Sequence, residues 1–301
     1  MELPKSVKIV EVGPRDGLQN ETRMVPTTTK IDFINLLSET GLTAIETTSF
    51  VSPKKIPQLA DHDEVYRGIT RIPGIIYSAL VPNEQGLAQA IQCQVPEIAI
   101  FASASESFSQ RNINCSIRES LDRYALVTTS ALQHGMRVRA YISCVLGCPY
   151  EGDIDFAIIR DLALELLSMG CYEVCFGDTI GKGTPGRTLA LLDEILRHVP
   201  RERCALHFHN TYGQAIANIF AGLQQGISTF DSSVSGLGGC PYAIGATGNV
   251  ATEDVVYLLN GLGIHHGVDL GKLVTAGIFI DRALQRETAS NVARAVRKSP
   301  L

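Results

Sequence analysis

The chain of 301 residues is long enough to bury a large core, either as one α/β barrel or as two smaller domains. Its hydrophobic content of 45% and charged content of 19% are typical of an ordinary globular protein. A net charge of −5 gives no reason to expect nucleic acid, and no apolar run is long enough to span a bilayer. The first residues lack a secretory or transit pattern, so we expect a cytoplasmic location with no nucleic-acid or membrane partner.

Short β-like runs alternate with amphipathic helical runs along the chain. Strands are expected over residues 7–12, 44–48, 75–81, 97–102, 137–144, 173–176, 204–209 and 229–234. Helices are expected over residues 28–40, 62–70, 84–93, 117–134, 154–169, 187–198, 214–225, 253–262 and 270–285. Glycines such as Gly41, Gly135 and Gly226 follow several of these helices and indicate where they end.

Eight strands with intervening helices predict an α/β fold, a (β/α)8 TIM barrel. Such a barrel takes about 250 residues, so residues from about 263 to 301 are expected to form extra C-terminal helices. No linker-like or low-complexity tract divides the chain, which predicts a single domain over residues 1–301. A doubly wound open sheet is the rival fold, but the segment after its first strand lacks the glycine-rich turn that binds dinucleotides.

The eight cysteines do not indicate a disulfide scaffold, because the chain is long and shows no export signal. Cys144 and Cys148, and likewise Cys171 and Cys175, are four positions apart, a spacing that suits a structural zinc. Their apolar surroundings favour buried free thiols instead. Cys240 differs from these because it lies in a glycine-rich loop.

Two histidines, His207 and His209, alternate along a predicted strand, so their side chains should point to the same side. Imidazole suits several divalent metals, while Asp16 offers an anionic oxygen and Asn249 a neutral amide oxygen. A mixed nitrogen and oxygen donor set with open positions is typical of a catalytic metal site. The alternatives are two surface histidines and, for Asp16, a turn or capping residue.

Polar residues also fall where the predicted strands end. They are Arg15, Asp16, Glu46, Asp178, His207, His209, Cys240 and Asn249. Catalytic groups of TIM barrels gather at the carboxyl ends of strands, so we expect all of these at one mouth of the barrel. A guanidinium such as that of Arg15, aimed at a carbonyl oxygen, would stabilise a developing enolate; the alternative for Arg15 is an ordinary surface cation.

Four stretches share the pattern of one enzyme family: Val12-Gly-Pro-Arg-Asp-Gly-Leu-Gln-Asn-Glu, Ile45-Glu-Thr-Thr-Ser-Phe, Gly177-Asp-Thr-Ile-Gly and Gly236-Leu-Gly-Gly-Cys-Pro-Tyr. With them, essentially the whole chain resembles the 3-hydroxy-3-methylglutaryl-CoA lyase family of the DRE-TIM metallolyase superfamily. The last stretch is particular to this lyase and its close relatives. Asn210 departs from the family, which usually has Asp there, and we expect this position to support the neighbouring ligand.

The resemblance implies a metal-dependent carbon–carbon lyase that cleaves (3S)-3-hydroxy-3-methylglutaryl-CoA to acetyl-CoA and acetoacetate. It also implies an acyl-CoA partner and a homodimer. The roles that it implies are Mg²⁺ or Mn²⁺ binding by Asp16, His207, His209 and Asn249, polarisation of the thioester carbonyl by Arg15, active-site carboxylates at Glu46 and Asp178, and proton transfer by Cys240.

Three alternatives stay open. The first is a lyase of the same mechanism that acts on a related 3-hydroxyacyl-CoA. The second is a condensing enzyme of the superfamily, such as an isopropylmalate synthase, although those enzymes usually carry additional C-terminal regions. The third is a non-catalytic metal-binding barrel, which the complete set of polar residues disfavours.

Overall fold

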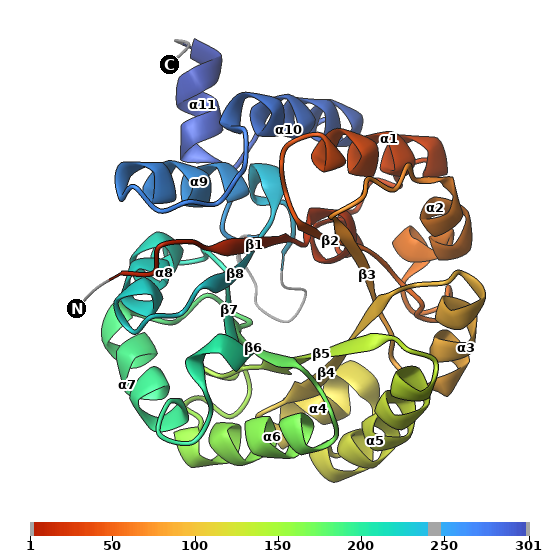
Figure 1. The fold of residues 1–301 in the computed structure, drawn as a ribbon, viewed down its shortest axis with the longest axis vertical. Helices are drawn as coiled ribbons and strands as arrows, with labels where there is room; N and C mark the ends of the chain where they lie inside the picture. Colours follow the sequence, from red (N-terminus) through yellow and green to blue (C-terminus); the bar gives the residue numbers. More distant parts are fainter. Residues whose placement is uncertain (1–2, 240–247, 299–301) are drawn as a thin grey trace.

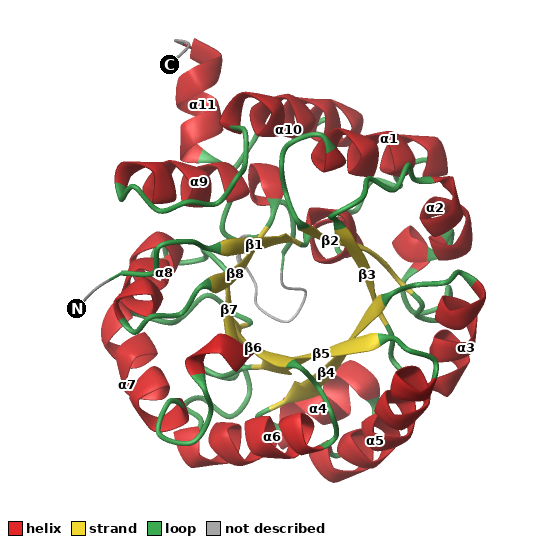
Figure 2. Ribbon diagram, in the orientation of Figure 1, coloured by secondary structure: helices red, strands yellow, loops and turns green. Residues whose placement is uncertain are grey.

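In the computed structural model, which describes residues 3–239 and 248–298, eight parallel strands close into a barrel in chain order. Helices surround the strands on the outside (Figures 1 and 2). The closed order from β1 to β8 confirms the (β/α)8 TIM barrel. It also excludes the doubly wound open sheet, which has two free edges.

All expected strands and helices are present, with bounds that differ by at most three residues. The strands are β1 (Lys8–Glu11), β2 (Ala44–Ser49), β3 (Ile76–Leu80), β4 (Glu97–Ser103), β5 (Arg137–Ser143), β6 (Glu173–Asp178), β7 (Cys204–Phe208) and β8 (Thr229–Ser232). The expected helices are α1 (Thr27–Ser38), α2 (His62–Gly68), α3 (Glu84–Gln92), α5 (Ile117–Gln133), α6 (Phe156–Ser168), α7 (Pro185–Ile195), α8 (Ala215–Gln224), α9 (Thr252–Gly261) and α10 (Leu270–Leu284).

Several short elements were not predicted from the sequence. They include the π-helix η1 (Gly13–Gly17), the helix α4 (Glu106–Ile113) and the single-turn 3₁₀ segment η4 (Val234–Gly236), whereas α11 (Asn291–Lys298) lies within the expected C-terminal helical extension. The N-terminus of α4 is capped by Ser105, whose hydroxyl accepts a hydrogen bond from the backbone N–H of Phe108 at 3.1 Å. The unpredicted elements have eight residues or fewer, which is too short to show a clear helical period.

The side chains of the barrel divide into two sets because strand residues alternate between faces. Large apolar side chains on one face, such as Phe176, Phe208 and Phe230, are fully buried in the main core, to which both strands and helices contribute side chains. A separate small cluster on the other face fills part of the barrel interior. It consists of Leu80, Ala99, Tyr141, Cys175 and Ala205, one residue from each of β3 to β7.

The C-terminal helices lie beside the start of the chain. Helix α10 packs against α1, and α11 packs against α9 (blue in Figure 1). The carboxylate of Asp254 in α9 accepts hydrogen bonds from the backbone N–H groups of Asn291 and Val292, at 3.2 Å and 2.9 Å. This carboxylate therefore satisfies the first free N–H groups of α11.

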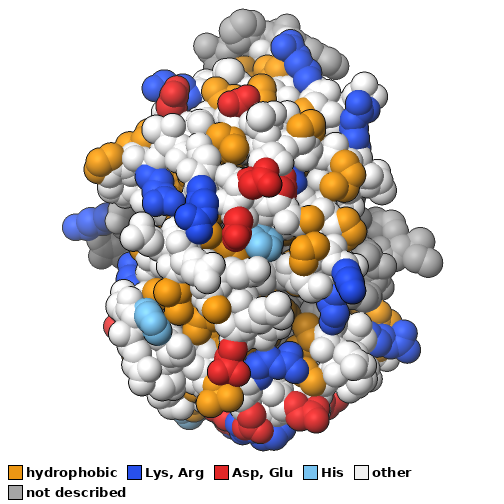
Figure 3. Space-filling view, turned by 90° about the vertical axis from the view of Figure 1, so that its right-hand side faces the viewer, with side chains coloured by type: hydrophobic (Ala, Val, Ile, Leu, Met, Phe, Trp, Pro, Cys, Tyr) orange, Lys and Arg blue, Asp and Glu red, His pale blue; other side chains and the backbone are white. Residues whose placement is uncertain are grey.

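The described residues bear on two sequence-based predictions, which concern the state of the cysteines and the presence of membrane-spanning segments. All seven cysteines among them are buried and free, as predicted, whereas Cys240 lies outside the described residues. Across residues 3–239 and 248–298, no helix has the length and apolar character needed to cross a bilayer. The side face in Figure 3 carries scattered hydrophobic side chains among charged ones.

Candidate functional site

Three side chains with metal-binding atoms meet at the mouth of the barrel. The carboxylate of Asp16 comes from η1, and the imidazoles of His207 and His209 come from the carboxyl end of β7. One ligand atom from each lies within 4.8 Å of the others, and the two imidazole ring centroids are 5.3 Å apart. The sequence therefore predicted correctly that these side chains converge.

Asn249 completes the cluster. Its amide Nδ2 donates to Asp16 Oδ2 at 2.8 Å and to the Leu237 carbonyl at 3.2 Å. Its Oδ1 is buried and has no hydrogen-bond partner among the described residues. A buried oxygen without a partner costs about 1–3 kcal/mol, so this oxygen is suited to a cation. One carboxylate, two imidazoles and one amide oxygen form a donor set that fits a divalent metal.

Asp16 is held as an anion although its side chain is only 20% exposed. Burial acts to raise the pKa of Asp16, but the charges of Arg15, His207 and His209 outweigh it and lower that pKa to about 2. For His207, burial acts to lower the pKa, but the hydrogen bond to Asp231 and the charge of Asp16 raise it above its ordinary value. Asp16 is therefore ionised at neutral pH and can serve as an anionic ligand.

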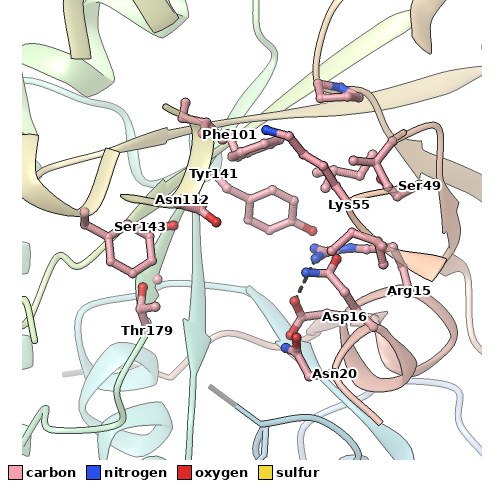
Figure 4. A pocket seen from close by; sticks show the side chains of 18 of the residues that line it. Arg15, Asp16, Asn20, Ser49, Lys55, Phe101, Asn112, Tyr141, Ser143 and Thr179 are labelled. Carbon is pink, nitrogen blue, oxygen red and sulfur yellow. Dashed lines mark hydrogen bonds and ion pairs between the residues drawn. The ribbon is translucent and has the colours of Figure 1, made fainter. Parts of the chain in front are cut away.

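Arg15 is fixed by a short chain of polar groups. Its Nε donates to Glu46, and its Nη1 donates to Asp16 Oδ1 at 2.7 Å. The Tyr141 hydroxyl donates to the other Glu46 oxygen at 2.8 Å. Figure 4 shows this hydroxyl directed toward the Arg15 guanidinium. Burial acts to lower the pKa of Arg15, but Glu46 and Asp16 more than offset it, so the guanidinium stays charged at the cavity wall.

Arg15, Asp16 and the two histidines border a cavity of about 550 Å³. Leu80, Phe101 and Ile142 give one part of its wall an apolar character. Figure 4 shows Lys55 and Phe101 on the same side of this cavity. Besides Arg15, the basic groups of the lining include Lys55, Arg111 and Arg123, and the polar uncharged ones include Asn20, Asn112, Ser143 and Thr179. The cavity therefore offers cations, hydrogen-bonding groups and apolar surface to one bound molecule.

The side chains of Asp178 and Asn210 accept hydrogen bonds from the backbone of neighbouring segments in this structure. Burial raises the pKa of Asp178 to about 6, and its carboxylate accepts hydrogen bonds from the backbone N–H groups of Lys182 and Gly183 at 3.1 Å and 2.8 Å. Asp178 is not among the residues that line the cavity. Asn210 Oδ1 accepts a hydrogen bond from the backbone N–H of Ala215, at the start of α8.

Sequence reasoning missed three buried polar residues near the cluster: Tyr141, Arg139 and Asp231. Arg139 and Tyr141 are two positions apart on β5, and Asp231 lies within β8. A charged residue inside an otherwise apolar strand was the available signal. Alternation within β5 would have directed both of its residues into the barrel.

Comparisons with known proteins agree with this geometry. The HMGL-like family matches residues 6–280. A Pseudomonas aeruginosa protein named 3-hydroxy-3-isohexenylglutaryl-CoA/hydroxy-methylglutaryl-CoA lyase is 58% identical over 296 residues, which cover 98% of this chain and 99% of the relative. The rat protein named 3-hydroxy-3-methylglutaryl-CoA lyase, cytoplasmic, is 56% identical, with 99% of this chain and 87% of the relative covered. The crystal structure of hydroxymethylglutaryl-CoA lyase from Pseudomonas aeruginosa has a TM-score of 0.97 at 57% identity, with 99% of each chain covered.

Proposed function

The chain belongs to the HMGL-like family, and we propose that it is a lyase that cleaves (3S)-3-hydroxy-3-methylglutaryl-CoA to acetyl-CoA and acetoacetate. The observation that carries this proposal is the meeting of Asp16, His207 and His209 beside a buried arginine at the wall of one cavity. The reaction breaks a carbon–carbon bond next to a tertiary hydroxyl and leaves the enolate of acetyl-CoA. It therefore needs a cation near the hydroxyl and another near the enolate oxygen.

Asp16, His207, His209 and Asn249 would hold one Mg²⁺ or Mn²⁺, because together they supply two imidazoles and two oxygen donors. When bound, such a cation lowers the pKa of a coordinated hydroxyl and supplies Lewis-acid stabilisation. Mg²⁺ favours oxygen ligands and Mn²⁺ accepts both kinds of donor, so we propose that either ion supports the reaction.

Arg15 would stabilise the enolate oxygen. Its guanidinium is fixed by Glu46 and Asp16 before substrate binds, so little reorganisation is needed when negative charge develops. The role of Glu46 is then to orient the guanidinium. We further propose, from the family resemblance, that Cys240 transfers a proton at the enolate carbon, and that Asp178 is a further carboxylate of the active site.

A second candidate substrate is 3-hydroxy-3-isohexenylglutaryl-CoA. The Pseudomonas relative carries this compound in its name beside the methyl compound. The cavity of about 550 Å³ and its apolar residues Leu80, Phe101 and Ile142 favour room for a larger 3-substituent. Lys55, Arg111 and Arg123 offer cations to the anionic part of either acyl-CoA.

Incubation of the purified protein with Mg²⁺ and each acyl-CoA tests both candidates. We expect acetyl-CoA and acetoacetate from the methyl compound, measured by mass spectrometry. Release of acetyl-CoA from the isohexenyl compound as well would establish the broader specificity. If neither compound is cleaved at any divalent-metal concentration, the proposed function is wrong.

The assembly, location and domain organisation are further parts of the proposal. We infer a homodimer, which light scattering of the purified protein tests as twice the mass of one chain. We infer a cytoplasmic location; one rat relative is named cytoplasmic, and a second rat relative is named mitochondrial. Because α10 packs against α1, we also infer one folding unit, with residues from about 263 as its C-terminal extension.

A further inference from the structure

A buried ion pair lies inside the barrel, directly behind the metal-binding cluster. Arg139 Nη2 donates to Asp231 Oδ1 at 2.8 Å, and Arg139 Nη1 donates to Asp231 Oδ2 at 3.2 Å. The side chain of Arg139 is 3% exposed and that of Asp231 is fully buried. Charges this deep are costly unless they are paired and hydrogen-bonded, so this pair has a defined geometry.

The register between β7 and β8 places Asp231 of this pair next to His207. Residue His207 of β7 is aligned with Asp231 of β8, and Arg139 of β5 is aligned with Glu173 of β6. Aligned residues of neighbouring parallel strands project to the same face. Arg139 Nε also donates to Glu173 at 2.7 Å, so the guanidinium is held from a second side.

The contact between Asp231 and His207 determines which imidazole nitrogen carries the proton. His207 Nδ1 lies 3.3 Å from Asp231 Oδ2. His207 Nε2 lies on the side of Asp16, 4.0 Å from its Oδ2. A carboxylate can only accept at Nδ1, so this nitrogen carries the proton in the neutral ring, and Nε2 is the nitrogen left available to a metal at the cluster.

We propose that Asp231, held in place by Arg139, is a positioning residue that keeps His207 in the tautomer and orientation needed to bind a metal through Nε2. This inference rests on the metal site of the proposed function. A hydrogen bond that a metal-binding histidine donates from its other ring nitrogen to a carboxylate fixes the ring orientation and raises the basicity of the ligand.

Arg139 links this arrangement to the other half of the site. Its Nη1 also donates to the Tyr141 hydroxyl at 2.9 Å, and that hydroxyl donates to Glu46, the partner of Arg15. One buried guanidinium therefore supports both a metal-binding imidazole and the group that faces the enolate. The competing explanation is that the ion pair only fills the barrel interior.

The test uses the metal-free protein, so its result is independent of which substrate is cleaved. Long-range ¹H–¹⁵N spectra report the tautomer of each histidine, and the His207→Asn variant assigns the His207 signals. We expect Nδ1 of His207 to be protonated in the unmodified protein. A His207 protonated at Nε2 alone overturns the proposal, and this measurement needs no Asp231 variant to fold.

The second part of the test is Asp231→Asn, which keeps the side-chain volume and removes the charge. We expect population of the other His207 tautomer and a weakening of Mn²⁺ binding, followed by electron paramagnetic resonance, of about 10- to 100-fold. The matched control is Glu97→Gln, because Glu97 is a buried strand carboxylate that accepts from the Tyr172 hydroxyl at 3.0 Å and, in the described structure, is hydrogen-bonded to neither His207 nor Asp231. Unchanged Mn²⁺ affinity in Asp231→Asn, or an equal loss in Glu97→Gln, overturns the proposal.

Discussion

At the scale of single residues, the site depends on charges that their neighbours fix in advance. Arg15 is held between Glu46 and Asp16, and Asp16 is held between Arg15 and the histidines. Asp16 is therefore shared between the part of the site that would hold a metal and the part that would stabilise an enolate. A change at one of these residues should affect catalysis without unfolding the barrel.

Arg15→Gln should lower kcat by a factor of about 10³ with little change in KM, because loss of one such donor acts mainly on the transition state. Steady-state kinetics with 3-hydroxy-3-methylglutaryl-CoA measure this. The control is Arg23→Gln, since Arg23 is an exposed arginine of the same segment of the chain. A change in KM alone would instead make Arg15 a binding cation.

Cys240→Ser should leave Mn²⁺ binding intact and reduce kcat strongly, because a serine hydroxyl is far less acidic than a thiol. The matched control is Cys115→Ser, at a buried cysteine whose substitution should affect stability rather than turnover. Retention of most of kcat across neutral pH in Cys240→Ser would rule out the proton-transfer role. Glu46 or Asp178 would then be the better candidate.

At the scale of elements, buried carboxylates hold the short segment that follows β8. Both oxygens of Glu253, in α9, accept from the backbone N–H of Ser235 at 3.0 Å, and Ser235 has a φ of 59°. Glu11, in β1, accepts from the backbone N–H of Val234 at 2.9 Å. Burial raises the pKa of Glu253 to about 8 and that of Glu11 to about 7. These elements are thus joined by carboxyl groups whose pKa values burial raises into the neutral range.

The free energy of unfolding should fall as pH rises from about 4.5 toward 8, because the folded state binds these protons more tightly than the unfolded chain. The contribution of Glu253 is complete below pH 4.5 and is lost as pH rises through about 8. Glu253→Gln should flatten this slope by on the order of 1 kcal/mol per pH unit. Urea unfolding across this pH range measures it, with the exposed Glu39→Gln as control. Parallel slopes in Glu253→Gln and the unmodified protein would contradict this explanation.

The elements that could be predicted from the sequence are those in which the pattern of apolar residues corresponds to the buried positions. Strand β7 and helix α5 were predicted nearly to their ends, since β7 is a short run buried at every position and α5 buries one regular face. The π-helix η1 was missed because its form depends on packing rather than on a period: a Cβ on Gly17 would lie 2.7 Å from Cβ of Leu237. The Arg139–Asp231 pair was missed because β5 and β8 are not neighbours in the barrel, so their contact across the barrel interior depends on closure of the whole sheet.

At the scale of the whole molecule, closure of the barrel gathers distant parts of the chain at one mouth. Asp16 and Asn249 are 233 positions apart in sequence, yet Asn249 Nδ2 lies 2.8 Å from Asp16 Oδ2. Parallel strands make this possible because their carboxyl ends all face the same way. The central claim of this account is that one divalent cation bound at this mouth is required for carbon–carbon bond cleavage.

The most direct test is a titration of the metal-free protein with Mn²⁺, with binding and cleavage of 3-hydroxy-3-methylglutaryl-CoA measured on the same samples. We expect no turnover before addition, one ion bound per chain, and turnover that rises in proportion to occupancy. His209→Ala should abolish this tight binding, while His198→Ala, at an exposed histidine after α7, should not. Full turnover without metal, or unchanged binding in His209→Ala, would contradict the account.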